Sequence, residues 1–272
     1  MKVWVLFSQH KKTLMAGLMA LLFIPNSAYS FDFSTLSAQE RQHIADKIFA
    51  NECNRSRECL VAWNDGENFA SLGIGHFIWF PAGVHPPFQE SFPDVLAWMD
   101  KSHIEKPDTL AWLTPQTPCP WPNKAAFLSP SQQPKIQALR QWLDINKEAQ
   151  VSFILLRLQD ALEKMVSVST AAEATVIRAQ FERIAQAKGG GYILADYVNF
   201  KGEGVKESER YQGEGWGLRQ VLLSMSASFD ARQAFVQAAK AVLQQRVDLS
   251  PPSRGEQRWL KGWFKRLDTY LQ

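Results

Sequence analysis

The residues of this sequence whose types and order suggest chemistry are Glu52, Asp65 and Ser71, which follow one another within a short stretch. A glutamate, then an aspartate, then a hydroxyl on a glycine-rich segment is typical of enzymes that cleave glycosidic bonds. Such bonds are normally cleaved between two carboxyl groups: one protonates the leaving oxygen, and the other activates water or stabilises the sugar cation. Glu52 and Asp65 are the candidates for these two roles.

The segment over residues 65–76 has a distinctive order, an aspartate followed by Ser71-Leu72-Gly73-Ile74-Gly75-His76. It resembles the active-site hairpin of phage-type lysozymes, in which an aspartate precedes the run Thr-Ile-Gly-Ile-Gly-His. The resemblance covers about residues 40–80. It implies that Glu52 is the general acid, that Asp65 assists it and that the Ser71 hydroxyl orients water. Serine replaces the threonine of the family, and twelve residues, more than in the family, separate Glu52 from Asp65.

A helix is predicted over residues 37–51, with Glu52 at its C-terminal end. Ser37 and Glu40 have the spacing of a capping box, and apolar residues recur with a helical period. The apolar face consists of Ile44, Ala45, Ile48 and Phe49. The helix dipole and apolar packing would both favour the protonated carboxyl that a general acid needs. The alternative is a solvated glutamate in a charged loop with Arg55, Arg57 and Glu58.

Two short strands are predicted between residues 69 and 80, after a turn at Asp65-Gly66. Gly73 and Gly75 allow the backbone either to approach a sugar closely or to form a tight hairpin. His76 is a lone histidine in an apolar segment. We predict that it is structural and supports the helix of Glu52 rather than taking part in catalysis.

A second group of polar, aromatic and glycine residues lies in the region 196–220, predicted to be loops. Residues of these types at this density are typical of a binding site. The candidates for substrate binding are Glu67 in the first region and Asn199, Arg210, Tyr211, Trp216 and Gln220 in the second. Glu203 and Glu214 are alternative carboxylates. The other interpretation is a glycine-rich connector whose charges pair with one another.

Three cysteines, Cys53, Cys59 and Cys119, follow residue 30. A disulfide between Cys53 and Cys59 would hold the segment that separates Glu52 from Asp65, although Cys119 could instead pair with either of them. No metal site is predicted, because neither Cys-x-x-Cys nor His-x-x-x-His spacing accompanies these residues. The resemblance to phage-type lysozymes implies that no other cofactor is required.

Residues 1–30 are predicted to be a secretory signal peptide, because Lys2, Lys11 and Lys12 precede an apolar run that ends before Ala28-Tyr29-Ser30. That run is shorter than the roughly 20 residues of a membrane span; an uncleaved N-terminal anchor is the alternative. Cleavage takes the formal charge from +3 to +3 minus 3, or about zero, so no nucleic-acid partner is expected. We expect a periplasmic or extracellular monomer without an integral membrane segment.

The rest of the chain, residues 31–272, is predicted to be a single α+β domain, mainly α and lysozyme-like, with a small β-hairpin or sheet and a large helical lobe. Residues 31–133 hold the first helix, the hairpin and a segment whose prolines exclude one long helix. Residues 134–272 form the helical lobe. Helical periodicity is present at 136–143, 151–165, 171–187, 229–247 and 254–271.

These features predict a secreted muramidase that cleaves peptidoglycan. The first alternative is a lytic transglycosylase, in which one glutamate does the acid and base work and a hydroxyl of the sugar replaces water. The second is a hydrolase of another amino-sugar polymer. A non-catalytic protein that binds cell-wall glycans is the alternative of a different class, because a fold alone does not establish function.

Overall fold

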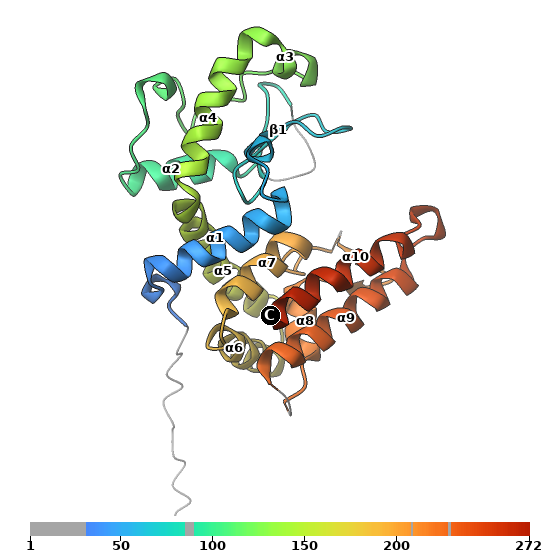
Figure 1. Cartoon of the computed structure of the whole chain (residues 1–272). Coiled ribbons are helices and arrows are strands. Elements are labelled where there is room, and N and C mark those ends of the chain that lie inside the picture. The colour runs from blue at the N-terminus through green and yellow to red at the C-terminus, as the bar shows by residue number, and fades with distance from the viewer. Residues whose placement is uncertain (1–30, 85–89, 208, 228–229) are drawn as a thin grey trace, which may run out of the picture.

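The computed structural model describes residues 31–84, 90–207, 209–227 and 230–272, so the predicted signal peptide lies outside the described residues. The described chain is mainly helical with a small antiparallel sheet, as predicted. Figure 1 shows two lobes, one with the sheet and one of helices. The first lobe contains α2 (Phe92–Lys101), α3 (Lys124–Leu128) and α4 (Gln133–Ile145), and α1 (Ala38–Cys53) and α5 (Lys147–Ser167) lie where the lobes meet.

The second lobe holds the C-terminal half of the chain. Its elements are α6 (Ala171–Ala185), α7 (Gly190–Lys201), the paired strands β4 (Arg210–Tyr211) and β5 (Glu214–Gly215), α8 (Leu218–Ser224), α9 (Ala231–Leu249) and α10 (Gln257–Asp268). Parts of the region 196–220 are therefore helical rather than loop, because the apolar residues of α7 are buried against neighbouring helices. None of the helices in the described part of the chain is long and apolar enough to cross a bilayer.

Helix α1 forms as its sequence predicts. The Ser37 side chain accepts a hydrogen bond from the backbone of Glu40, and the Glu40 side chain accepts one from the backbone of Ser37, which completes the capping box. The predicted apolar face is buried. The helix ends at Cys53, followed by Asn54 in the left-handed conformation with φ of 46°. Glu52 therefore belongs to the last turn of α1.

The small sheet has the strand order β1-β2-β3, with β1 at Val61–Ala62, β2 at Ala70–Leu72 and β3 at Phe77–Trp79. Strands β2 and β3 are the two predicted strands, and Ser71 pairs with Ile78. Strand β1 was not predicted. It pairs with the other edge of β2, so the long segment between Glu52 and Asp65 adds a strand to the sheet.

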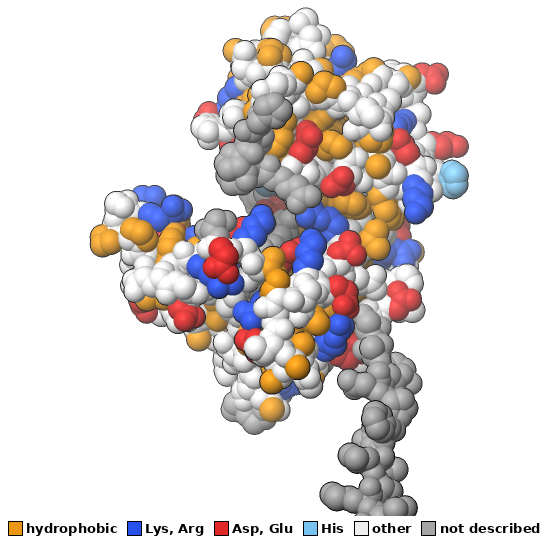
Figure 2. Space-filling view, turned by 180° about the vertical axis from the view of Figure 1, so that it is seen from behind, with side chains coloured by type: hydrophobic (Ala, Val, Ile, Leu, Met, Phe, Trp, Pro, Cys, Tyr) orange, Lys and Arg blue, Asp and Glu red, His pale blue; other side chains and the backbone are white. Residues whose placement is uncertain are grey.

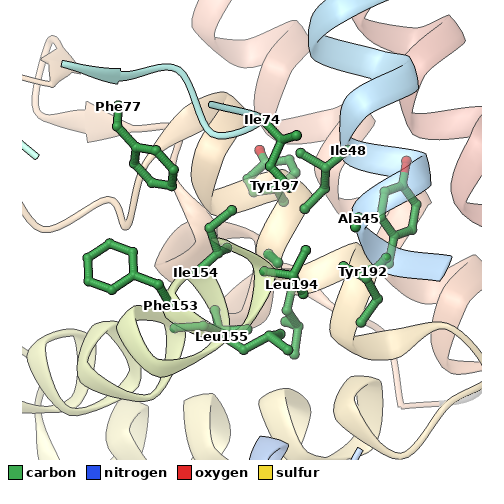
Figure 3. Packing of buried hydrophobic residues seen from close by; sticks show 14 of the residues in the cluster. Ala45, Ile48, Ile74, Phe77, Phe153, Ile154, Leu155, Tyr192, Leu194 and Tyr197 are labelled. Carbon is green, nitrogen blue, oxygen red and sulfur yellow. The ribbon is translucent and has the colours of Figure 1, made fainter. Parts of the chain in front are cut away.

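One cluster of buried apolar side chains extends from the sheet into the helical lobe. Figure 3 shows Ile74 and Phe77 from the hairpin beside Phe153 and Ile154 of α5, with Tyr197 of α7 close by. This packing fixes the hairpin relative to α5 and α7. It therefore determines where Glu52 lies relative to the residues of the C-terminal half.

A buried carboxylate, that of Glu256, links the start of α10 to α9. Glu256 is 1% exposed and accepts hydrogen bonds from Arg246 of α9 at 2.7 and 2.9 Å, from Arg254 at 3.2 Å and from the Tyr211 hydroxyl at 2.8 Å. Burial alone would raise the pKa of Glu256, but the hydrogen bonds from Arg246 and Tyr211 outweigh burial and lower its pKa to about 2.

This lowered pKa predicts a specific loss of stability in acid. In the unfolded chain Glu256 takes up a proton near its ordinary pKa of 4.5, whereas the folded protein resists protonation until about pH 2. The stabilisation from this carboxylate is therefore complete above pH 4.5 and is lost as the pH falls towards 2. Urea unfolding at several pH values should show this slope. Glu256→Gln should remove this part of it, whereas the exposed Glu214→Gln should not; an unchanged slope in Glu256→Gln would contradict the assignment.

Candidate active site

A cleft of about 400 Å³ opens beside the end of α1. Its walls come from the hairpin, from α5 and from α7 with the loop that follows it. The lining residues are Glu52, Gly75, His76, Phe77, Ile78, Ser91, Ile154, Arg157, Leu158, Ala195, Val198, Asn199, Glu203 and Lys206. On the face shown in Figure 2, acidic and basic side chains gather where the two lobes meet. The cleft thus combines charged and amide groups with an apolar wall, which suits a polar ligand with apolar ring faces.

Glu52 is largely buried, with 15% of its side chain exposed. Its Oε1 accepts a hydrogen bond from Arg266 Nη2 at 2.5 Å and one from Asn199 Nδ2 at 3.2 Å, and its Oε2 lies 3.8 Å from Nδ1 of His76. It is therefore not a solvated loop residue. Its surroundings are also not the apolar ones predicted, because the charged side chain of Arg266 contacts it directly.

Arg266 reaches Glu52 from α10 and is anchored by Asp196, a fully buried residue of α7. Asp196 accepts two hydrogen bonds from Arg266, at 2.8 and 2.9 Å, one from the Tyr270 hydroxyl at 2.5 Å and one from Asn51 at 3.2 Å. Burial disfavours the charge of Arg266, but Asp196 and Glu52 outweigh that effect and raise the pKa of Arg266. Arg266 is thus a permanent cation in contact with Glu52.

Asp65 and Ser71 do not line this cleft. The side chain of Asp65 is fully exposed and accepts a hydrogen bond from Lys124 at 2.5 Å, which lowers the pKa of Asp65. The Ser71 side chain is buried in β2 and donates to Glu67 at 3.5 Å, and Glu67 also accepts from Asn64 at 3.0 Å. Asp65 points elsewhere because the preceding segment is taken up by the 3-10 turn Arg57–Leu60 and β1.

The glycines of the hairpin are required by packing. Gly73 has φ of +68°, and a Cβ atom there would lie 2.2 Å from Oε1 of Gln150, a fully buried residue of α5. That oxygen accepts a hydrogen bond from the backbone of Ile74 at 2.9 Å. At Gly75, which lines the cleft, a Cβ would lie 2.7 Å from the Phe77 ring. Packing within the protein is therefore enough to exclude a side chain at both positions, whether or not a sugar binds there.

Gly73→Ala should therefore destabilise the protein by at least about 2 kcal/mol, because it adds a clash with Gln150 to the cost of a left-handed backbone in a residue other than glycine. Gly66→Ala is the matched control, since Gly66 has φ of +81° but open space around its Cβ position. Chemical denaturation should show the larger loss at Gly73. Equal losses would mean that the backbone conformation, not the packing on Gln150, sets the cost.

The other predicted binding residues separate into two groups. Asn199 lines the cleft, and so does Glu203, which pairs with Lys164 at 3.1 Å. Tyr211, Trp216 and Gln220 lie outside the cleft lining and have structural partners. The Tyr211 and Trp216 rings are 4.7 Å apart, the Tyr211 hydroxyl binds Glu256, and the Gln220 side chain bonds the backbones of Gly217 and Gly204. Arg210 pairs with Glu207, and Glu214 is exposed in β5.

The predicted disulfide between Cys53 and Cys59 is confirmed, with 5.3 Å between the Cα atoms, and Cys119 is free and buried. Burial raises the pKa of the Cys119 thiol to about 12, so this cysteine is inert. The disulfide lies next to His76, whose Nε2 is 3.0 Å from Sγ of Cys59. His76 thus stands between the disulfide and Glu52.

The sequence alone does not single out Arg266, Arg157 or the anchoring role of Asp196. Arg157 and Arg266 belong to helices with many charged residues, where nothing local distinguishes them from solvated side chains. The burial of Asp196 could have been predicted, because it is the single charged residue within the apolar run Ile193-Leu194-Ala195-Asp196-Tyr197-Val198. A charge in such a run is rarely buried without a partner.

Comparison of this chain with protein-family models, with curated proteins and with solved structures found no match. The function is therefore inferred from the geometry of the cleft and the chemistry of its residues.

Proposed function

We propose that this protein cleaves glycosidic bonds in peptidoglycan as a muramidase, with Glu52 as the catalytic carboxyl group. The observation that supports this most directly is the position of Glu52, in the last turn of α1, facing a cleft that it shares with the hairpin and α7. Asn199, which donates to Glu52, is the kind of residue that also bonds sugar hydroxyls and acetamides. The sequence resemblance to phage-type lysozymes points to the same glutamate.

The two oxygens of Glu52 differ in a way that matters for acid catalysis. Oε1 is occupied by Arg266 and Asn199, whereas Oε2 accepts a hydrogen bond from neither and lies 3.8 Å from His76. Oε2 is therefore the oxygen that would hold the proton and pass it to the bridging oxygen of the glycan. Arg266 and Asn199 hold Oε1 and thereby orient the side chain.

Hydrolysis needs a second carboxyl group, and Glu203 is better placed for that role than Asp65. Glu203 lines the same cleft, and Lys164 pairs with it as a carboxylate. A carboxylate suits the residue that activates water or stabilises the sugar cation. Asp65 would need to leave Lys124 and change its direction to take part.

A lytic transglycosylase is the second candidate, and the position of Asp65 favours it. Chemistry with a single glutamate needs no second carboxyl group, so a cleft that contains Glu52 without Asp65 is consistent with it. Another amino-sugar polymer is a further candidate substrate, because the same carboxyl chemistry cleaves the glycosidic bonds of differently decorated sugars.

The products of peptidoglycan digestion distinguish these proposals. We expect mass spectrometry to show muropeptides with reducible muramic acid ends, produced by the wild-type protein and absent with Glu52→Gln. Anhydro-muramic ends would identify a transglycosylase, and release only from chitin-type polymers would change the substrate. Binding of glycan without release from any polymer, by a protein shown to be folded, would identify the non-catalytic alternative.

We also propose that the protein acts in the periplasm or outside the cell. The disulfide between Cys53 and Cys59 supports this, because such bonds persist in oxidising compartments. N-terminal sequencing of the exported protein should give Phe31 as the first residue if the signal is cleaved after Ser30.

A further inference from the structure

Three potential metal ligands meet beside the cleft: Cys53, Cys59 and His76. Their ligand atoms all lie within 4.8 Å of one another. The Nε2 atom of His76 is 3.0 Å from Sγ of Cys59 and 3.8 Å from Sγ of Cys53. Two thiolates and an imidazole are a donor set that zinc prefers. The spacing of the cysteines alone did not predict this, because the histidine comes from the hairpin.

The backbone would keep the two sulfurs together after reduction of the disulfide. Cys53 ends α1 and Cys59 lies in the 3-10 turn that follows, with their Cα atoms 5.3 Å apart. Two hydrogen bonds close the intervening segment, from Ser56 to the carbonyl of Cys53 at 2.7 Å and from Cys59 to the carbonyl of Ser56 at 3.3 Å. A tetrahedral zinc ion with Zn–S bonds of about 2.3 Å separates its two sulfurs by about 3.8 Å, which side-chain rotation alone can supply.

His76 is oriented for such a site. Its Nε2 faces the sulfurs, and its Nδ1 faces Glu52 Oε2 at 3.8 Å. In zinc proteins the second ring nitrogen of a histidine ligand is commonly held by a carboxylate, which fixes the ring and its tautomer. The His76 backbone has φ of 47°, a conformation that sets the direction of its side chain. One third of the His76 side chain is exposed, so a metal ion has access to it.

From these contacts we infer that reduction of the Cys53–Cys59 disulfide creates a zinc-binding site formed by Cys53, Cys59 and His76, with Glu52 supporting the histidine. An external dithiol gives two electrons and two protons to the disulfide; it becomes a disulfide itself and leaves two thiols. Zinc then displaces two protons, one from each thiol, and binds the thiolates and Nε2. The bound metal holds His76 against Glu52.

The expected effect of zinc on activity rests on the proposed function of Glu52. Glu52 would then be held by His76 through Oε2, the oxygen assigned to proton transfer, so zinc should inhibit the reduced protein and leave the oxidised protein unaffected. Zinc binding itself does not depend on the proposed function. Metal bound by a protein that releases no glycan in either redox state would preserve the site and overturn the function.

The test is metal binding by the full chain before and after reduction with dithiothreitol, which is then removed without oxygen. Cobalt(II) is the probe, because thiolate ligands give it charge-transfer bands and a tetrahedral site gives it intense visible bands. We expect one cobalt ion per reduced chain, displaced by zinc, and none per oxidised chain. Cys119→Ser should bind identically, since that thiol is buried elsewhere. No binding by the reduced chain would overturn the inference, as would loss of its fold on reduction, measured by circular dichroism.

Variants test each ligand. Cys59→Ser should abolish cobalt binding. His76→Asn, which tolerates the left-handed backbone, should weaken it by at least about 100-fold, more than the loss of an outer-shell partner. Wild-type affinity and spectrum in His76→Asn would show that the sulfurs bind metal without the histidine, which contradicts the inferred site. Thermal unfolding of each variant before metal addition checks that the fold is intact.

Discussion

Glu52→Gln should lower the rate of peptidoglycan cleavage by about 10³-fold or more, within the range that general acid catalysis supplies. The amide cannot donate a carboxylic proton to the bridging oxygen, but it has the size of the carboxyl group and still accepts hydrogen bonds from Arg266 and Asn199. Folding and glycan binding should therefore be nearly unchanged. The measurement is the initial rate of muropeptide release at several pH values.

Glu58→Gln is the matched control, because Glu58 is an exposed glutamate near the same disulfide and does not line the cleft. Asp65→Asn tests whether Asp65 takes part in catalysis. A rate close to that of the wild type is expected from the exposed position of Asp65, whereas a loss as large as that of Glu52→Gln would show that Asp65 reaches the substrate as in the resembled hairpin. A tenth of the wild-type rate or more in Glu52→Gln would contradict the catalytic assignment of Glu52.

The parts of this fold that the sequence predicts are those determined by local interactions. The capping box of Ser37 and Glu40 sets the start of α1, and the alternation of apolar residues around two glycines sets the hairpin. The Cys53–Cys59 disulfide closes over a short separation, so it too is a local feature. These features suffice to predict that Glu52 lies at the C-terminal end of a helix that is followed by a hairpin.

What the sequence could not predict is which distant side chains surround Glu52. Arg266 lies 214 residues further along the chain, and it meets Glu52 because α10 packs on α9 and Asp196 of α7 holds the Arg266 side chain. Asp65 lies outside the cleft because the segment before it forms the 3-10 turn Arg57–Leu60 and β1, which pairs with β2. A sequence motif gives the order of residues in a loop, but the direction of the loop depends on the elements that pack around it.

The electrostatics of the site follow from this long-range packing. A glutamate at a helix C-terminus was expected in an apolar pocket, and instead the buried pair of Asp196 and Arg266 brings a cation to it. The cation of Arg266 thus contacts two carboxyl groups, those of Asp196 and Glu52. Arg266 therefore connects the packing of the helical lobe to the position of the candidate catalytic residue.

Asp196→Ala should lower the free energy of unfolding by about 3–5 kcal/mol, the cost of removing one partner from a buried ion pair. Asp196 is fully buried and accepts hydrogen bonds from Arg266, Tyr270 and Asn51, so its removal leaves the buried Tyr270 hydroxyl without that acceptor and Arg266 with Glu52 as its remaining carboxylate partner. Urea denaturation at neutral pH measures the loss.

Asp268→Ala is the control, because Asp268 also pairs with a cation from a neighbouring helix, Lys240, but at the surface, where such pairs contribute at most about 1 kcal/mol. A loss in Asp196→Ala no larger than that of Asp268→Ala would mean that Arg266 does not depend on its buried anchor. With the expected loss, much of a typical total stability of about 5–15 kcal/mol would be gone. The contact between Asp196 of α7 and Arg266 of α10 would then be required for a stable fold, as well as for the position of Arg266 next to Glu52.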